Sequence, residues 1–172
     1  MNNRYRPAAI LVFLAAVAAA AAAQTAEEKR ASGVPARGDH VMGFDHAKTT
    51  HHFRLTPSGG RIEAEANDSA DTDSRDQIRQ HFTHIAKMFS DGDFDAPMLI
   101  HEKVPPGVPV LKELKSSIRY TFEPTERGGS IVISTKNARA REAIHEFLRF
   151  QIDDHKTGDS TAIEKKPIRK LS

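Results

Sequence analysis

An internal repeat constrains the fold of this chain more than any other feature of its sequence. Residues 50–93 and 116–159 show the same order of patterns: two short segments in which apolar and polar residues alternate, then a longer segment with helical apolar periodicity. Each copy is therefore predicted to be a ββα unit. One unit alone leaves an apolar sheet face and an apolar helix stripe in water, and packing two units together buries both. We expect an α+β fold in which a four-stranded antiparallel sheet carries two helices on one face, with residues 94–115 as the connector.

Constant offsets relate the two copies. Phe53 corresponds to Phe122 and Ile62 to Ile131 at an offset of 69 residues, which predicts an approximate two-fold axis in the sheet. The helical segments correspond at an offset of 66, because the loop before the second helix is three residues shorter. Glycine pairs at equivalent positions are interpreted as the hairpin turns: Gly59 and Gly60 in the first copy, and Gly128 and Gly129 in the second.

Each predicted helix has a start, an apolar face and a stop. Ser74 precedes Gln77 by three residues, which is the spacing of a capping box, and Gly92 suits the C-terminal stop. The second helix is expected to run from Asn137 to a stop at Gly158. Apolar residues at helical spacing form the faces expected in the core: Ile78, Phe82, Ile85, Ala86 and Phe89 in the first helix, and Ala140, Ile144, Phe147, Leu148 and Ile152 in the second.

Residues 1–23 have the pattern of a secretory signal peptide. Arg4 and Arg6 are followed by an uncharged run that ends in alanines. A membrane anchor is the alternative, but the run of about 16 residues is shorter than the ~20 apolar residues that span a bilayer. We expect cleavage after Ala23, no stable membrane anchor afterwards, and a periplasmic or secreted protein.

The flanks of the repeat have a different composition from the repeat itself. Residues 24–41 lack an apolar period and are predicted to be a disordered leader, and residues 160–172 a basic flexible tail, which leaves 42–159 as the folded domain. The chain has no cysteine, so we expect neither a disulfide nor a lipid anchor. Loss of Arg4 and Arg6 with the signal peptide leaves equal numbers of basic and acidic residues. Without a basic stripe, nucleic acid is not an expected partner.

The chain has nine histidines, and the densest group lies at the start of the domain. Met42, His46, His51 and His52 fall within a short segment. Imidazole suits copper and zinc, and a thioether adds a soft ligand that favours Cu(I). Because neighbouring side chains of a strand point to opposite faces, His51 and His52 face one site only if the strand begins after them. These residues are the first candidate ligands.

A second candidate ligand pair lies on the first predicted helix. His81 and His84 are three residues apart, a spacing that lets two side chains meet one ion. Together with His101 they also define an alternative, a hydrolase or small-molecule site between the two helices and the proline-rich connector. His101, His145 and His155 are otherwise scattered and are expected at the surface or, for His155, at a helix C-terminus.

Enzymatic activity is not predicted, because no catalytic motif is present. The sequence has no cysteine nucleophile, no Gly-x-Ser-x-Gly elbow, no phosphate-binding glycine loop and no His-Glu-x-x-His.

A second alternative is a protein-interaction module that docks a cell-envelope partner on the outward sheet face. The residues expected there are polar and suit a transient partner: Arg54, Arg61, Glu63, Glu65, Arg119, Thr121 and Glu123.

The domain also resembles a group of small exported bacterial proteins. The resemblance is carried by Met-Gly-Phe-Asp at 42–45, Thr-Thr-His-His-Phe at 49–53, Pro-Pro-Gly-Val at 105–108, and the segments 144–152 and 155–159. It implies the limits of the domain and no activity, cofactor or partner. The sequence as a whole predicts an exported, non-catalytic binding or accessory protein that holds copper or zinc through histidine and methionine.

Overall fold

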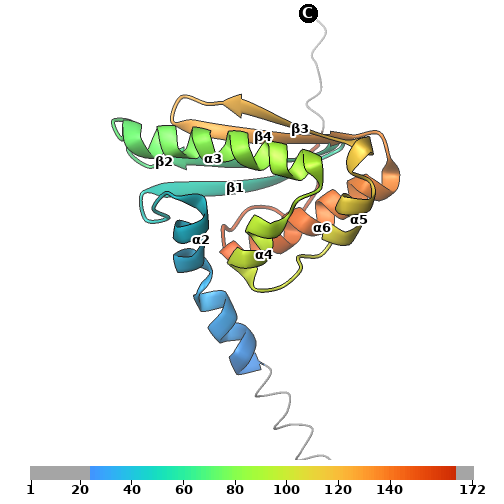
Figure 1. Cartoon of the computed structure of the whole chain (residues 1–172), viewed down its shortest axis with the longest axis horizontal. Coiled ribbons are helices and arrows are strands. Elements are labelled where there is room, and N and C mark those ends of the chain that lie inside the picture. Colours follow the sequence, from blue (N-terminus) through green and yellow to red (C-terminus); the bar gives the residue numbers. More distant parts are fainter. Residues whose placement is uncertain (1–23, 166–172) are drawn as a thin grey trace, which may run out of the picture. The chain divides into compact units, whose positions relative to one another are not determined.

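The computed structural model describes residues 24–165 (Figure 1). The predicted signal peptide and the last residues of the predicted tail lie outside these described residues. The chain divides into two compact units, Met1–Gly33 and Val34–Ser172. In the first unit, residues 24–32 are helical. Within residues 24–165, no helix combines the length and apolarity that crossing a membrane requires.

The second unit contains the sheet and the helices that cover it. The sheet has the order β1-β2-β4-β3, and all three neighbouring pairs are antiparallel. The strands are β1 (Thr49–Thr56), β2 (Gly59–Ala66), β3 (Ile118–Pro124) and β4 (Gly128–Thr135). The helices are α2 (Val34–Met42), α3 (Thr72–Asp91), α4 (Asp95–His101), α5 (Val108–Glu113) and α6 (Ala138–His155), with a 3-10 turn at Lys115–Ser117. The predicted α+β fold with a four-stranded antiparallel sheet is confirmed.

The register of the sheet follows the repeat. Ile62 of β2 lies opposite Ile131 of β4, so the two equivalent residues of the copies face each other at the centre of the sheet. Phe53 lies opposite Ile62 in β1 and β2, and Phe122 lies opposite Ile131 in β3 and β4. A two-fold rotation that exchanges the two copies turns the Phe53–Ile62 pair into the Phe122–Ile131 pair and leaves the Ile62–Ile131 pair unchanged. The approximate two-fold axis therefore passes between Ile62 and Ile131.

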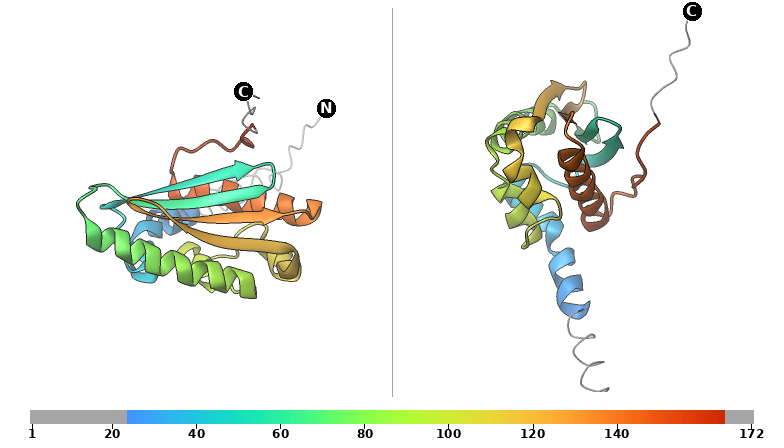
Figure 2. Two further views of the ribbon diagram at one scale, coloured as in Figure 1. Left: turned by 90° about the horizontal axis from the view of Figure 1, so that it is seen from above. Right: turned by 90° about the vertical axis from the view of Figure 1, so that its right-hand side faces the viewer.

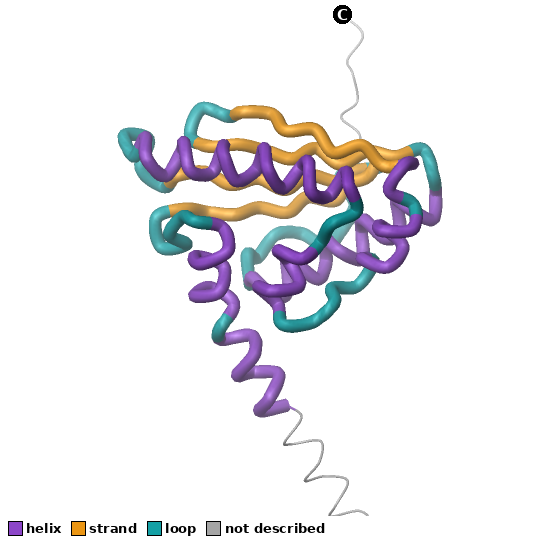
Figure 3. The backbone as a smooth tube through the Cα atoms, in the orientation of Figure 1, coloured by secondary structure: helices purple, strands orange, loops and turns teal. Residues whose placement is uncertain are grey.

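The main helices lie together on one face of the sheet, as predicted. Figures 2 and 3 show α3 and α6 on the same side, where they pack against the inner faces of the strands. The apolar residues predicted for both helix faces are all buried. α2, α4 and α5 lie on this side as well, with α2 against α4 and α5 against α6. Within residues 24–165, no helix covers the outer face of the sheet.

Helix α3 begins three residues earlier than the capping box predicts. Asp71 is the N-cap, because its Oδ1 accepts a hydrogen bond from the Ser74 backbone N at 3.0 Å. The Ser74 hydroxyl donates to the other carboxylate oxygen of Asp71 at 2.7 Å. An aspartate accepts these bonds at least as well as serine does, and its charge also suits the helix N-terminus. Gly92 ends the helix in the left-handed region, with φ of 79°, as predicted.

Helix α6 starts as predicted and ends before the predicted stop. The Asn137 side chain accepts from the Ala140 backbone N at 3.0 Å and caps the first turn. At the other end the C-cap is Lys156, with φ of 53°, and Gly158, which also has a positive φ of 75°, lies two residues beyond it. The Lys156 backbone N still donates to the Ile152 carbonyl, which closes the last turn.

Gly60 is a packing position and not a turn residue. The β1–β2 hairpin turns through Pro57 and Ser58, and Gly59 and Gly60 already belong to β2. A Cβ atom at Gly60 would lie 2.1 Å from Leu148 Cδ1. Glycine at this position therefore lets α6 approach the sheet closely. The interpretation of the glycine pairs as turns is wrong for both copies, since Gly128 and Gly129 likewise belong to β4.

We expect Gly60→Ala to lower the free energy of unfolding by about 1–3 kcal/mol, because the added methyl group overpacks the contact with α6. Urea unfolding followed by circular dichroism measures the change. The double variant Gly60→Ala/Leu148→Ala is the control. Its loss should be smaller than the sum of the two single losses, since removal of the Leu148 side chain makes room for the methyl group. Additive losses would contradict this explanation.

Both flanks are more ordered than the sequence predicts. Part of the predicted disordered leader forms α2, in which Val34 is buried and Arg37 Nε donates to the Ile100 carbonyl at 2.6 Å. These contacts with α4 stabilise a helix that has no amphipathic pattern of its own. In the predicted tail, Ile163 pairs with Leu55 as a parallel bridge, and the backbone N of Glu164 donates to the Leu55 carbonyl at 2.8 Å. The described part of the tail thus covers the edge of β1.

Candidate functional site

A cavity of about 70 Å³ lies beneath the sheet, among α2, α3, α4 and α6. Most of its wall is apolar and comes from the core, for example Phe53, Ile62 and Ile131 of the sheet. A smaller set of lining residues carries nitrogen or sulfur atoms that can bind a ligand: Met42, His51, His81, His101, Gln151 and His155. We call this site the histidine cavity.

Four secondary-structure elements bring the histidines together. His51 belongs to β1, two residues before buried Phe53 and therefore on the same, inner face of the strand. His81 lies on α3 beside Phe82. His101 is the last residue of α4, and His155 is the last residue of α6. The cluster therefore forms where the ends of α4 and α6 and the middle of α3 pack against β1.

The imidazole rings are in contact with one another and with Phe44. The ring of His155 stacks on His51 with centroids 6.2 Å apart and meets the edge of His101 at 5.0 Å. Phe44 stacks on His51 at 5.6 Å and contacts the ring of His81 edge-on at 5.7 Å. These contacts pack the rings against one another and limit the access of water to them.

His101 is fully buried and is held by two hydrogen-bonding partners. Its Nδ1 lies 2.5 Å from Asp154 Oδ2, and its Nε2 lies 2.9 Å from Gln151 Oε1. The Asp154 carboxylate is also nearly inaccessible to solvent. A carboxylate that binds one ring nitrogen orients an imidazole and increases the basicity of the other nitrogen.

Two polar atoms of the histidine cavity are buried without a partner among the described residues. They are His51 Nε2 and Gln151 Nε2. A buried polar atom with no hydrogen bond costs about 1–3 kcal/mol, so such atoms are uncommon in a folded protein. A metal ion would supply the missing partner of His51 Nε2, whereas the Gln151 amide nitrogen is a donor and needs an acceptor.

Burial keeps three of these histidines neutral. Burial first, and then the charges that His81 and His52 would carry, lower the pKa of His51 to about 4. The pKa of His81 also falls to about 4, first through burial and then through His84. For His155, burial is again the main cause, followed by His101 and His51, and the pKa is about 3. At pH 7 these imidazoles are therefore neutral, the form that binds metal ions.

The structure joins only part of the predicted ligand set. Met42, His51 and His81 line the histidine cavity, which unites members of two clusters that the sequence treats separately. His52 points to the other face of β1, where its Nδ1 lies 2.9 Å from Asp159 Oδ1. His84 is exposed on α3 and does not line the cavity.

His46 belongs to a separate surface group. Its Nδ1 lies 2.7 Å from Asp39 Oδ2, and its backbone N donates to the other oxygen of Asp39 at 2.7 Å. Asp45 accepts from the Ala47 backbone N at 2.7 Å. Among the described residues, this trio of Asp39, Asp45 and His46 has three ligand atoms within 4.8 Å of one another. Its carboxylates already accept the backbone bonds of this turn, and the group is largely exposed.

Sequence reasoning missed His155 and Gln151, and it grouped His101 with His81 only for the alternative small-molecule site. His155 lies three residues after Ile152, so the helical period alone would have placed it on the buried face of α6. His101 has no such pattern, because α4 is short and was not predicted. The expectation that His145 lies at the surface is also wrong. His145 is buried, and its Nε2 lies 3.0 Å from the Thr56 carbonyl oxygen, to which it can donate.

Comparisons of this chain with protein families, characterised proteins and solved structures give no match. Its function is therefore argued from the geometry of the site. The histidine cavity offers neutral imidazoles, a thioether and an apolar wall in a small volume. No three of its described histidines have ring nitrogens within 4.8 Å of one another, so a bound ion would require the rings to turn toward it.

Proposed function

We propose that this protein is an exported, non-catalytic binding or accessory protein that holds a transition metal ion in the histidine cavity. One observation carries the proposal. Four histidines from four elements converge with Met42 on one small apolar cavity, and His51 Nε2 is buried there without a partner in the described part of the chain. Met42, His51, His81 and His155 are the proposed ligands, with His101 beside them.

Copper is the first choice of metal and zinc the second. A thioether combined with imidazoles is a soft donor set that selects Cu(I), while imidazole alone also suits Zn(II). No carboxylate lines the cavity, which disfavours hard cations such as Mg²⁺ and Ca²⁺. Asp154 supports the site from outside by orienting His101.

The size of the cavity favours an ion over an organic ligand. An engineered cavity of about 150 Å³ is known to accept benzene, and the histidine cavity has about half that volume, about 70 Å³. The alternative of a hydrolase or small-molecule binder at this place therefore requires the helices to move apart. An ion needs only rotations of the rings, which lie on β1, on α3 and at the ends of α4 and α6.

Variants that separate the cavity histidines from the others test the proposal. The cavity variant replaces His51, His81 and His155 with alanine, and the matched control replaces His46, His52 and His84. Titration with Cu(I), Cu(II) and Zn(II) should show one equivalent bound by the natural protein. We expect the cavity variant to lose at least about 100-fold in affinity, because three ligands are removed, and the control to change by less than about threefold.

Single substitutions guard against a failure of the cavity variant to fold. His51→Ala, His81→Ala and His155→Ala should each weaken binding, while circular dichroism reports whether the fold persists. Loss of metal binding in the control variant, with binding retained in the cavity variant, would move the site to the surface residues. No binding of any of the three ions to the natural protein would refute the proposal.

The alternative of a cell-envelope partner on the outer sheet face has less support. Apart from Arg119, the charged residues predicted there form ion pairs, for example Arg54 with Glu63 at 2.9 Å and Arg61 with Glu123 at 3.4 Å. Such a self-paired surface leaves few charges for a partner to complement. Co-purification of a stoichiometric partner that persists in chelator would favour this alternative over metal binding.

A further inference from the structure

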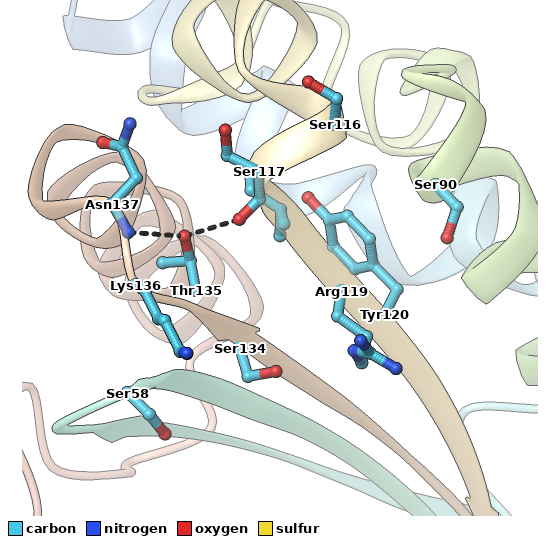
Figure 4. A pocket seen from close by; sticks show the side chains of 11 residues that line it. Ser58, Ser90, Ser116, Ser117, Arg119, Tyr120, Ser134, Thr135, Lys136 and Asn137 are labelled. Carbon is cyan, nitrogen blue, oxygen red and sulfur yellow. Dashed lines mark hydrogen bonds between the residues drawn. The ribbon is translucent and has the colours of Figure 1, made fainter.

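A second site lies at the start of strand β3, and it shares no lining residue with the histidine cavity. It is a cleft of about 790 Å³ that follows β3, an edge strand paired only with β4 (Figure 4). Its volume is within the range of small-molecule sites, about 300–1,000 Å³. Most of its lining residues carry a hydroxyl group, two carry a positive charge, and none carries a carboxylate.

The cleft has a cationic side and a hydroxyl side. Arg119 and Tyr120 are successive residues of β3 and therefore point to opposite faces of the strand. Figure 4 shows Lys136 extending toward Ser134, on the same side of β3 as Arg119. Neither Arg119 nor Lys136 forms an ion pair with a residue in the described part of the chain, and both are exposed. They provide an attractive potential for an anion.

The hydroxyl side contains a buried group that lacks a partner. Tyr120 is 9% exposed, and its hydroxyl oxygen has no hydrogen bond within residues 24–165. Figure 4 shows this hydroxyl on the side on which Ser116 and Ser117 lie, and its oxygen is inaccessible to water, so a ligand reaches it only if a neighbouring side chain moves. Burial raises the pKa of Tyr120, so the group stays a neutral donor and acceptor. A ligand hydroxyl at this position would complete its hydrogen bonding.

The start of α6 adds to the positive potential of the cleft. Asn137, the N-cap of this 18-residue helix, lines the cleft, and the first turn of α6 has no acidic residue. The positive end of the helix dipole is therefore not neutralised by a side chain of its own helix. Arg139 of the same turn is paired with Glu113 outside the cleft, at 2.6 Å.

We propose that this cleft binds a small anionic sugar, a class that includes uronates and sugar phosphates. The acid group lies between Arg119 and Lys136, and sugar hydroxyls bind Tyr120, Ser116 and Ser117. The cationic side of the cleft suits the acid group of the ligand, and the hydroxyl side suits its sugar. A guanidinium and an ammonium bind carboxylate or phosphate, and a row of side-chain hydroxyls with both donor and acceptor capacity matches a polyol.

Isothermal titration of the exported chain with four compounds tests the class of ligand. Glucuronate and glucose 6-phosphate represent the two sources of the acid group, while glucose and inorganic phosphate each supply half of the recognition. At least one anionic sugar should bind, at least about tenfold more tightly than glucose and than phosphate. Whichever of the two binds better identifies the acid. Equal binding of phosphate and glucose 6-phosphate, or no binding of either sugar acid, would overturn the proposal.

Variants with a matched change of charge test the residues. Arg119→Ala/Lys136→Ala should weaken binding at least about tenfold, because both charge-assisted contacts are lost. Arg75→Ala/Lys112→Ala removes the same charge from α3 and α5, outside the cleft, and should leave the affinity unchanged. Equal effects of the two double variants would show that net charge alone attracts the ligand and would refute the site.

Tyr120→Phe separates the proposed ligand contact from a structural role. It removes only a hydroxyl that has no partner in the described chain, so the melting temperature should stay the same or rise. Affinity for the anionic sugar should fall about fivefold, the usual effect of one lost hydrogen bond. An unchanged affinity, or a protein that loses stability while it keeps its affinity, would contradict the assignment of Tyr120.

Discussion

Acidification from pH 7 to pH 4 should lower the free energy of unfolding of the metal-free protein by at least about 3 kcal/mol. The cause is the set of half-buried neutral histidines, His51, His81 and His155. Their pKa values in the folded chain are about 4, about 4 and about 3, against 6.5 in an unfolded chain. A fall from 6.5 to about 4 in one histidine corresponds to roughly 3 kcal/mol.

The sign follows from where protons bind. Between pH 6.5 and pH 4 the unfolded chain takes up protons on these histidines and the folded chain does not. Unfolding is therefore favoured as the pH falls, by up to about 1.4 kcal/mol per pH unit for each histidine. Above about pH 7.5 both states are neutral at these positions, so the dependence vanishes. The charges that His52, His84 and His101 would carry help to lower the pKa values of these rings. The Asp154 carboxylate acts in the other direction and raises the pKa of His155.

Urea unfolding at pH 7.5, 6, 5 and 4 in the presence of a chelator measures the effect. His51→Phe keeps an aromatic ring on Phe44 and removes one titrating group, so it should reduce the slope between pH 6 and pH 5 by about one proton. The control variant His46→Ala/His52→Ala/His84→Ala should keep most of the slope. A natural protein with the same stability at pH 7.5 and pH 5 would contradict the burial of these imidazoles.

The sheet was predictable because its determinants are local and repeated. Alternation in each copy identifies the strands, and the offset of 69 residues places Ile62 opposite Ile131 once the sheet is symmetric. The apolar faces of α3 and α6 follow from helical spacing in the same way. Short helices behave differently. α2 is stabilised by contacts such as the bond from Arg37 to the Ile100 carbonyl, which no local pattern encodes.

The candidate site was predictable only in part, for the same reason. Met42 and His51 could be grouped because they are close in the sequence, but this closeness also grouped them with His46 and His52, which lie elsewhere. His81 joins the cavity through the packing of α3 on the sheet. His155 is separated from His51 by more than a hundred residues, so only the closed fold brings their rings to 6.2 Å. When the residues of a site come from elements that are distant in the sequence, tertiary packing brings them together and sequence spacing does not predict them.

The pair formed by Asp154 and His101 is expected to be the most sensitive contact of the site. We expect Asp154→Asn to lower the free energy of unfolding by about 3 kcal/mol, because removal of the carboxylate leaves His101 buried without its charged partner. Asp153→Asn is the matched control. It lies next in the chain on α6 but is exposed, so the change should stay within about 0.5 kcal/mol.

Metal affinity decides whether this pair supports the site or only the fold. In a metal-binding cavity, loss of a carboxylate that orients an imidazole reduces affinity about 10- to 100-fold. Asp154→Asn should show this loss when Cu(I) or Zn(II) is titrated at a temperature where the variant is folded, and Asp153→Asn should not. If Asp154→Asn loses stability but binds metal as tightly as the natural protein, the pair stabilises α4 against α6 and has no part in ligand binding. If it loses neither, the short contact between the two side chains contributes little, and the contact with Gln151 is enough to hold the His101 ring.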